Sequence, residues 1–318
     1  MDGRIIGVFG ADKELKGKFE GSVAKKSEVE GMIVYHRTEA GRRFSFLDDP
    51  QFPDKIQGYS RIASISDYAC YLYPPSGRLS APDGELAVLL ESFKLPGRVE
   101  LVDSAAGPED VKNTFKGLSL ASYSVERRSA QSSVIDLADT EGASSGPRGT
   151  LVYIDRAFSV KGVGTVVLGF VLAGKVSVHD KLRAVPSSPE KTVEVKGIQV
   201  NDEDQETVGR GLRVGLSLKG VDAKDLDKTS WLDDGSFALT EELQFRFAGS
   251  PFYKQEVAGR DLHLQLPGDT VLASIAKSGD VYSAALPKPV PHWNGMRLAV
   301  IDLNGKGLRV AGGGSAVV

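Results

Sequence analysis

The pattern of hydrophobic and polar positions changes near residue 150 and divides the chain into two parts. In the first part, short apolar runs alternate with segments whose apolar residues recur at helical spacing, as Leu86, Leu89 and Phe93 do. Alternation of this kind favours an α/β domain with a mostly parallel sheet. The predicted strands cover residues 4–9, 44–47, 69–73 and 99–102, and the predicted helices cover residues 84–93 and 108–115.

In the second part, short apolar runs recur between glycine, proline, aspartate and asparagine residues, and helical periodicity is weak. This pattern predicts small β-barrels. Residues 138–149 are rich in Gly, Ser and Asp and predict a linker, and Asp233-Asp234-Gly235 predicts a second boundary. We therefore expect three domains, at residues 1–148, 149–234 and 235–318.

Composition narrows the functional classes. The 318 residues carry a net charge of −3, so any nucleic-acid site must be a local patch, and we expect no DNA partner. Cys70 is the one cysteine, which excludes an internal disulfide and a cysteine-based metal site. The four histidines share no ligand spacing, so we expect no metal centre. Without a run of about 18 apolar residues or a secretory signal, the sequence predicts a cytoplasmic protein with no membrane partner.

The segment at residues 154–169 carries the clearest motif, because its glycines frame alternating valine and threonine positions. Two further runs, at residues 195–200 and 208–220, follow it. Together they resemble the second domain of the translation factors SelB and EF-Tu, and the first run is closest to SelB. Residues 307–314 are similar to the closing strand of the third domain in SelB-like factors. The resemblance implies an α/β P-loop GTPase-like domain followed by two small antiparallel β-barrels, of the EF-Tu domain 2 and domain 3 type.

The resemblance places a phosphate-binding loop, G-x-x-x-x-G-K-[ST], at residues 7–14, where its chemistry is degraded. Gly7 and Lys13 match the pattern, and Gly10 lies between them. Asp12 replaces the second glycine, and Glu14 replaces the hydroxyl that would hold magnesium. A carboxylate beside a phosphate site repels the anion.

The remaining nucleotide motifs are degraded as well. Asp48 matches the second switch, but Gln51 replaces its glycine and Phe52 replaces the histidine that orients the attacking water. Phenylalanine can neither accept nor donate a proton, so this route to hydrolysis is closed. The resemblance thus implies a degenerate GTPase domain with no catalytic residue, no metal and no required cofactor. Weak binding of GTP or GDP through Lys13 stays open.

The charged residues of the second domain match a site that SelB-like factors use for the amino acid carried by tRNA. In that family, an Asp-Arg pair and a further Arg surround the amino acid, and here Asp155, Arg156 and Arg213 stand at the matching positions. Guanidinium groups favour a thiolate or selenolate, so the implied ligand is cysteinyl- or selenocysteinyl-tRNA. Gln199 stands where EF-Tu-like factors contact the terminal adenosine.

The leading prediction is a SelB/EF-Tu-like protein that binds and protects the 3′ end of an aminoacyl-tRNA, with the ribosome as a further partner. Three alternatives stay open. Asp155, Arg156 and Arg213 also fit a structural ion pair between barrel strands. The chain also resembles the gamma subunit of archaeal initiation factor two, which makes a scaffold without tRNA binding the second candidate. A residual GTPase is the third.

Overall fold

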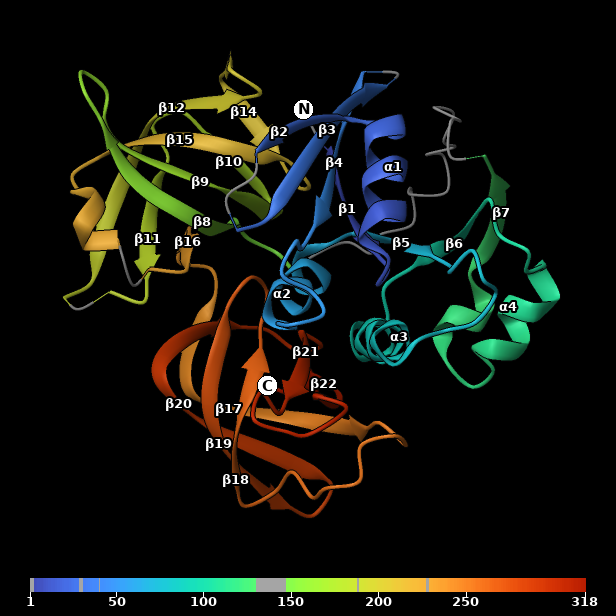
Figure 1. Cartoon of the computed structure of the whole chain (residues 1–318). Helices are drawn as coiled ribbons and strands as arrows, with labels where there is room; N and C mark the ends of the chain where they lie inside the picture. The colour runs from blue at the N-terminus through green and yellow to red at the C-terminus, as the bar shows by residue number, and fades with distance from the viewer. Residues whose placement is uncertain (1–2, 29–30, 40, 130–146, 188, 227–228) are drawn as a thin grey trace.

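The computed structural model describes residues 3–28, 31–39, 41–129, 147–187, 189–226 and 229–318. Most of the linker predicted at residues 138–149 lies outside them. An N-terminal α/β domain is followed by two β-rich domains, and the three are grouped around α2 (Figure 1). Within the described residues, every helix is too short or too polar to cross a lipid bilayer.

The N-terminal domain has a seven-stranded sheet in the order β2-β3-β4-β1-β5-β6-β7, in which β3 is antiparallel to both of its neighbours, β2 and β4, and the other neighbouring strands are parallel. Its strands are β1 (Gly3–Phe9), β2 (Lys25–Glu28), β3 (Ile33–Glu39), β4 (Arg42–Asp48), β5 (Tyr68–Leu72), β6 (Gly97–Val102) and β7 (Ser124–Arg128). Its helices are α1 (Lys13–Val23), α2 (Gln57–Ile65), α3 (Ala81–Phe93) and α4 (Pro108–Thr114), with a short 3-10 helix at Ser119–Ser122.

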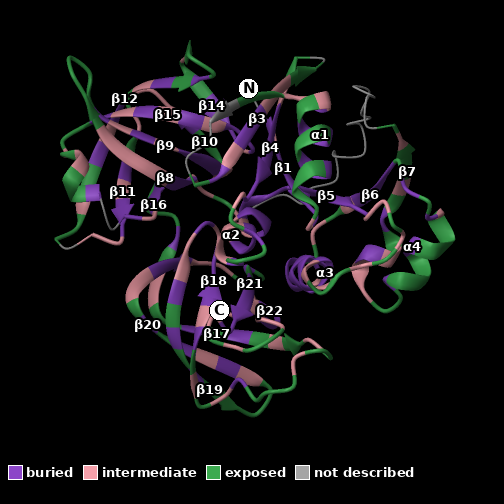
Figure 2. Ribbon diagram, viewed as in Figure 1, coloured by how far each residue is buried: buried purple, intermediate pink, exposed green. Residues whose placement is uncertain are grey.

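Strand alternation divides the core of this domain between the two faces of the sheet. Ile5 and Leu47 belong to the cluster that includes α2 and α3, whereas Ile6 and Phe46 belong to the cluster beneath α1. Both sets are buried (Figure 2). The sheet therefore has helices on both faces, as the alternating pattern predicts.

The second domain is a β-barrel. Its main sheet has the order β11-β16-β8-β9-β15-β12-β13, and β11 also pairs with β12, which joins the two ends. The strands are β8 (Leu151–Val160), β9 (Gly164–Ala173), β10 (Lys175–Ser177), β11 (Lys181–Val185), β12 (Lys191–Val200), β13 (Glu203–Gln205), β14 (Thr207–Gly209), β15 (Arg213–Lys219) and β16 (Trp231–Asp233). The register of β8 shifts at Asp155, which is the extra residue of a β-bulge opposite β9.

The C-terminal domain is a closed barrel in the order β17-β20-β19-β18-β21-β22. Its strands are β17 (Ala238–Gly249), β18 (Arg260–Gln265), β19 (Thr270–Ser278), β20 (Val281–His292), β21 (Arg297–Ile301) and β22 (Val310–Ala316). Strand β22 carries Gly312, Gly313 and Gly314, and a Cβ atom at Gly313 would lie 2.3 Å from the carbonyl oxygen of Ser92 in α3. The glycine thus allows α3 to pack directly on the barrel.

We expect Gly313→Ala to weaken the packing of α3 on the barrel by about 1–3 kcal/mol, because backbone atoms of Ser92 cannot yield as a flexible side chain would. The melting temperature of the whole chain measures this effect. Gly215→Ala is the matched strand control, since its Cβ would meet only a leucine methyl group at 3.5 Å. Equal melting temperatures for the two variants would contradict this account.

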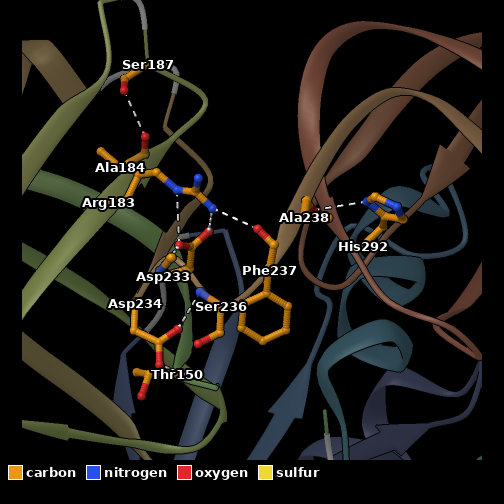
Figure 3. A network of polar contacts seen from close by, with 11 residues as sticks. Thr150, Arg183, Ala184, Ser187, Asp233, Asp234, Ser236, Phe237, Ala238 and His292 are labelled. Atoms are coloured by element: carbon orange, nitrogen blue, oxygen red, sulfur yellow. Dashed lines mark hydrogen bonds and ion pairs between the residues drawn. The ribbon is translucent and has the colours of Figure 1, made fainter. Parts of the chain in front are cut away.

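The two barrels are joined by a polar network (Figure 3). Arg183 donates to both carboxylate oxygens of buried Asp233, at 3.2 and 3.0 Å, and to the carbonyl oxygen of Phe237 at 2.9 Å. Asp234 accepts from the backbone N–H groups of Thr150 and Ser236. These bonds hold the segment between β16 and β17, so the predicted boundary at residues 233–235 is an ordered connection.

The N-terminal domain contacts the C-terminal barrel through α2 and α3. Ser60 donates to the Gln265 side chain at 2.9 Å, and Ser64 accepts from the backbone N–H of Gly268 at 2.9 Å. Arg309, just before β22, donates to both carboxylate oxygens of Glu85 in α3, at 3.1 and 2.6 Å. The position of α2 and α3 therefore depends on the barrel as well as on their own domain.

Candidate functional site

The boundary between the first two domains contains Asp155 and Arg213, two of the residues that the sequence singles out. Gly3 donates its backbone N–H to the carbonyl oxygen of Arg210 at 3.0 Å, and the Arg210 side chain pairs with buried Asp67 at 2.7 Å. Arg43 of β4 donates to the carbonyl oxygen of Val200 at 2.7 Å. These contacts place strands β1, β3 and β4 against the outer face of the second domain.

Asp155 and Arg213 meet on that outer face. Their side chains form an ion pair at 3.6 Å and are only 15% and 11% exposed. Arg213 is registered opposite Phe170 of β9, which is in turn opposite Tyr153 of β8, so these three side chains share one face of the sheet. The β-bulge at Asp155 turns its carboxylate to the same place.

Arg156 and Gln199 lie on the same sheet, in the next row of residues on that face. Gln199, Gly215, Leu168 and Arg156 are registered in one row across β12, β15, β9 and β8. The exposed Gln199 amide donates to Asp204 at 2.8 Å. The structure therefore places all four predicted tRNA-binding residues on one face, and brings Asp155 and Arg213 into direct contact.

The N-terminal domain supplies the opposite wall, which the sequence does not reveal. His36 of β3 is registered opposite Ser45 of β4, and its Nδ1 lies 3.3 Å from the Ser45 hydroxyl. Burial, followed by the nearby charges of Arg213 and Arg43, lowers the pKa of His36 to about 4. The imidazole is therefore neutral near pH 7, and the cations of the site keep it so.

The segment that resembles a phosphate-binding loop is short and internally bonded. Strand β1 ends at Phe9 and α1 begins at Lys13, so only residues 10–12 connect them. The backbone N–H of Ala11 donates to the Asp83 carboxylate at 3.0 Å, and the Asp12 carboxylate caps α1 by accepting from Leu15 N–H at 2.9 Å. Amides that could bind an anion at a helix N-terminus are thus already bonded to carboxylates.

Behind this loop, the buried side chain of Lys16 lies beside Asp48, the aspartate that matches the second switch. Lys16 of α1 pairs with Asp48 at 2.6 Å and donates to the Tyr59 hydroxyl at 2.7 Å, and that hydroxyl donates to Asp48 at 2.6 Å. The Lys16 and Asp48 side chains are only 2% and 8% exposed. Lys13, by contrast, is exposed and donates to the carbonyl oxygen of Pro50 at 3.1 Å.

Two further carboxyl groups lie near this pair. Burial and the charge of Asp48 raise the pKa of Glu20 to about 8, so this carboxyl is mostly protonated at pH 7, and burial also raises the pKa of Asp49. The charge of the Lys16 ammonium is already balanced by Asp48 within the chain.

The other residues of the degraded motifs are packing residues. Gly7 lies within β1, where a Cβ atom would lie 2.4 Å from the Phe9 ring. Gly10 follows β1 and packs near Leu72. Phe52 is fully buried, with its ring edge-on to Tyr59 at 5.1 Å between centroids.

Comparisons with known proteins agree with this architecture. A family model described as elongation factor Tu domain 2 matches residues 164–232. The selenocysteine-specific elongation factor of Methanocaldococcus jannaschii is 48% identical over 73 residues, which cover 23% of this chain and 15% of that protein. The structure of elongation factor SelB from Methanococcus maripaludis with the GTP analogue GppNHp covers 100% of this chain and 80% of its own, with 21% identity and a TM-score of 0.81. The second domain is similar to elongation factor Tu domain 2, and the chain shares the fold of SelB.

Two further matches cover almost the whole length of this chain. A bacterial selenocysteine-specific elongation factor has a TM-score of 0.85 at 16% identity, over 99% of this SelB-like chain and 58% of that one. An uncharacterized protein of Methanocaldococcus jannaschii is 26% identical over 323 residues, which cover 99% of both chains. The sequence prediction of an α/β domain followed by two barrels is therefore confirmed.

Proposed function

We propose that this SelB-like chain binds the aminoacylated 3′ end of a tRNA at the boundary between its first two domains and shields the ester bond. The observation that carries the proposal is the Asp155–Arg213 pair, which lies on the outer face of the second domain and against His36 of the first. Arg156 and Gln199 lie on the same face, which gives the tRNA terminus a surface next to the Asp155–Arg213 pair.

The charges around the Asp155–Arg213 pair favour an amino acid whose side chain ends in an acidic group. The planar donors of the Arg213 guanidinium group stabilise a soft anion such as a thiolate or selenolate. The neutral His36 adds no competing charge and offers a polar contact. We therefore propose cysteinyl- or selenocysteinyl-tRNA as the preferred ligand.

We further propose that the chain acts without GTP hydrolysis. Lys16 and Tyr59 both donate to Oδ1 of Asp48, and Asp83 accepts from the Ala11 amide, so groups that would bind phosphate and magnesium already have partners within the chain. Phe52 faces the core, where it has no reacting water to orient. Support for this step comes from the internal bonding of the loop.

The experiment is a protection assay, in which the rate of ester hydrolysis is measured for a panel of aminoacyl-tRNAs. We expect cysteinyl-tRNA to be protected better than alanyl-tRNA, and Arg213→Gln to weaken this protection at least about tenfold, as loss of a charge-assisted contact predicts. Lys219→Gln, on the same strand but exposed, is the matched control and should behave as the unaltered chain does.

The same assay separates the alternatives. Protection should be unchanged by GTP and magnesium, because no hydrolysis step is required. Protection that appears only with GTP and magnesium would overturn the proposal that the chain acts without GTP hydrolysis. Equal, weak binding of charged and uncharged tRNA at low salt would instead overturn the tRNA proposal.

A further inference from the structure

Two arginines of the C-terminal barrel flank a serine on a face that no assigned function uses. Ser315 of β22 is registered opposite Arg246 of β17 on one side and Arg297 of β21 on the other. Directly opposed residues in a sheet point to the same face, so all three side chains project outward together. The two arginine backbones are separated by two strand spacings, about 9–10 Å.

The end of α3 brings a third cation to the same place. Helix α3 stops at Lys94, which adopts a left-handed conformation with φ of 51°. Lys94, Arg246, Arg297 and Ser315 all line one cavity of about 330 Å³ between α3 and the barrel. Lys94 and Arg297 also line a cavity of about 860 Å³ at the junction of the three domains, so the two cavities meet at these cations.

The charges at this cavity are not balanced within the chain. Lys94 pairs with Glu91, and the other oxygen of Glu91 accepts from the backbone N–H and the hydroxyl of Ser119, both at 2.6 Å. Glu91 is thus fully engaged. In the part of the chain that the structure describes, Arg246 and Arg297 make no side-chain hydrogen bond or ion pair. Three cations therefore face a single carboxylate, in a protein whose overall charge is −3.

We propose that Arg246, Ser315 and Arg297 form a binding site for the phosphate group of a small organic phosphate, with Lys94 at its edge. Each guanidinium group offers several N–H donors in one plane, and the serine hydroxyl offers one O–H donor. Together these donors match the oxygens of a phosphate group. Arg297 and Arg246 approach from either side of Ser315, so a phosphate above the hydroxyl receives donors from both. This inference goes beyond the proposed binding of tRNA and does not depend on it.

The rest of the cavity indicates the kind of molecule. Val88 and Leu118 give it an apolar side, and Gly312, Gly313 and Gly314 of β22 also line it. A volume of about 330 Å³ lies at the lower end of the range typical of small-molecule sites. The organic part of the ligand would lie against this apolar side while the phosphate faces the arginines.

The test is a calorimetric titration of the whole chain with ribose 5-phosphate at low ionic strength. We expect saturable binding, a loss of affinity of at least tenfold in Arg246→Gln and in Arg297→Gln, and no change in Lys306→Gln, an exposed lysine of the same barrel. Unchanged melting temperatures in the arginine variants would show that the loss is local. A failure of ribose 5-phosphate to bind below about 10 mM would overturn the proposal. An affinity that is unchanged in both Arg246→Gln and Arg297→Gln would overturn it as well.

A short uridine oligonucleotide provides the second arm. If the oligonucleotide binds with the same dependence on Arg246 and Arg297 while ribose 5-phosphate does not bind, the site belongs to RNA and the small-molecule proposal is wrong. Protection of aminoacyl-tRNA in the Arg246→Gln variant should equal that of the unaltered chain, which keeps this site separate from the Asp155–Arg213 pocket.

Discussion

Replacing Lys16 with methionine should lower the free energy of unfolding by about 3–5 kcal/mol, because it leaves a buried carboxylate without its cation. Asp48 would keep its hydrogen bond from the Tyr59 hydroxyl, at 2.6 Å, but would lose the ammonium group that balances its charge. Methionine fills a similar volume, so the loss reports the charge and not a cavity. Urea unfolding followed by the fluorescence of Trp231 and Trp293 and by circular dichroism measures it.

The control is Lys18→Met on the same helix, where the lysine is solvent-exposed and pairs only with Glu14 one turn away. Its unfolding midpoint should match that of the unaltered chain. A double variant, Lys16→Met with Asp48→Asn, should recover much of the lost stability, since it removes both buried charges. If Lys16→Met alone were as stable as the unaltered chain, the Lys16–Asp48 ion pair would not be what holds α1 against β4.

Much of the fold follows from the sequence because its signals are local. The predicted helices at residues 84–93 and 108–115 correspond to α3 and α4, and Ser80 with Asp83 forms the capping box that starts α3. Helix α2 carries no such signal. It contains Gly58, where any Cβ would lie 2.2 Å from the Asp49 carboxylate, and it is stabilised by burial of Tyr59 and Ile62. Such packing becomes visible only in three dimensions.

The candidate site shows the same division. Asp155 and Arg213 are identified by a motif within one domain, and the register of β8, β9 and β15 then brings them together. His36 is not identified by any such motif, because its role depends on a second domain more than 100 residues away in sequence. Lys16 is missed for a similar reason. The loop pattern directs attention to Lys13, whereas Asp48 and Tyr59, 32 and 43 residues away, determine which lysine is buried.

Replacing Arg309 with methionine should loosen the N-terminal domain from the C-terminal barrel by about 2–5 kcal/mol, since it leaves Glu85 buried without its cation. Arg309 binds both Glu85 oxygens and also the carbonyl oxygens of Pro53 and Asp54, at 2.9 and 3.0 Å. One side chain thus fixes α3 and the loop before α2. Hydrogen exchange should become faster in residues 53–65, and the radius of gyration in solution should increase.

Lys306→Met, in the loop just before β22, is the matched control and should change neither quantity. The comparison also bears on how the chain works. If the proposed binding of aminoacyl-tRNA depends on the loop before α2, which Arg309 holds, then loosening this loop should reduce protection of aminoacyl-tRNA. Faster exchange in residues 53–65 with unaltered protection would show that the arrangement of α2 does not matter for the Asp155–Arg213 pocket. Slow exchange in the Arg309→Met variant would show that Gln265 and the surrounding core hold α2 without the arginine.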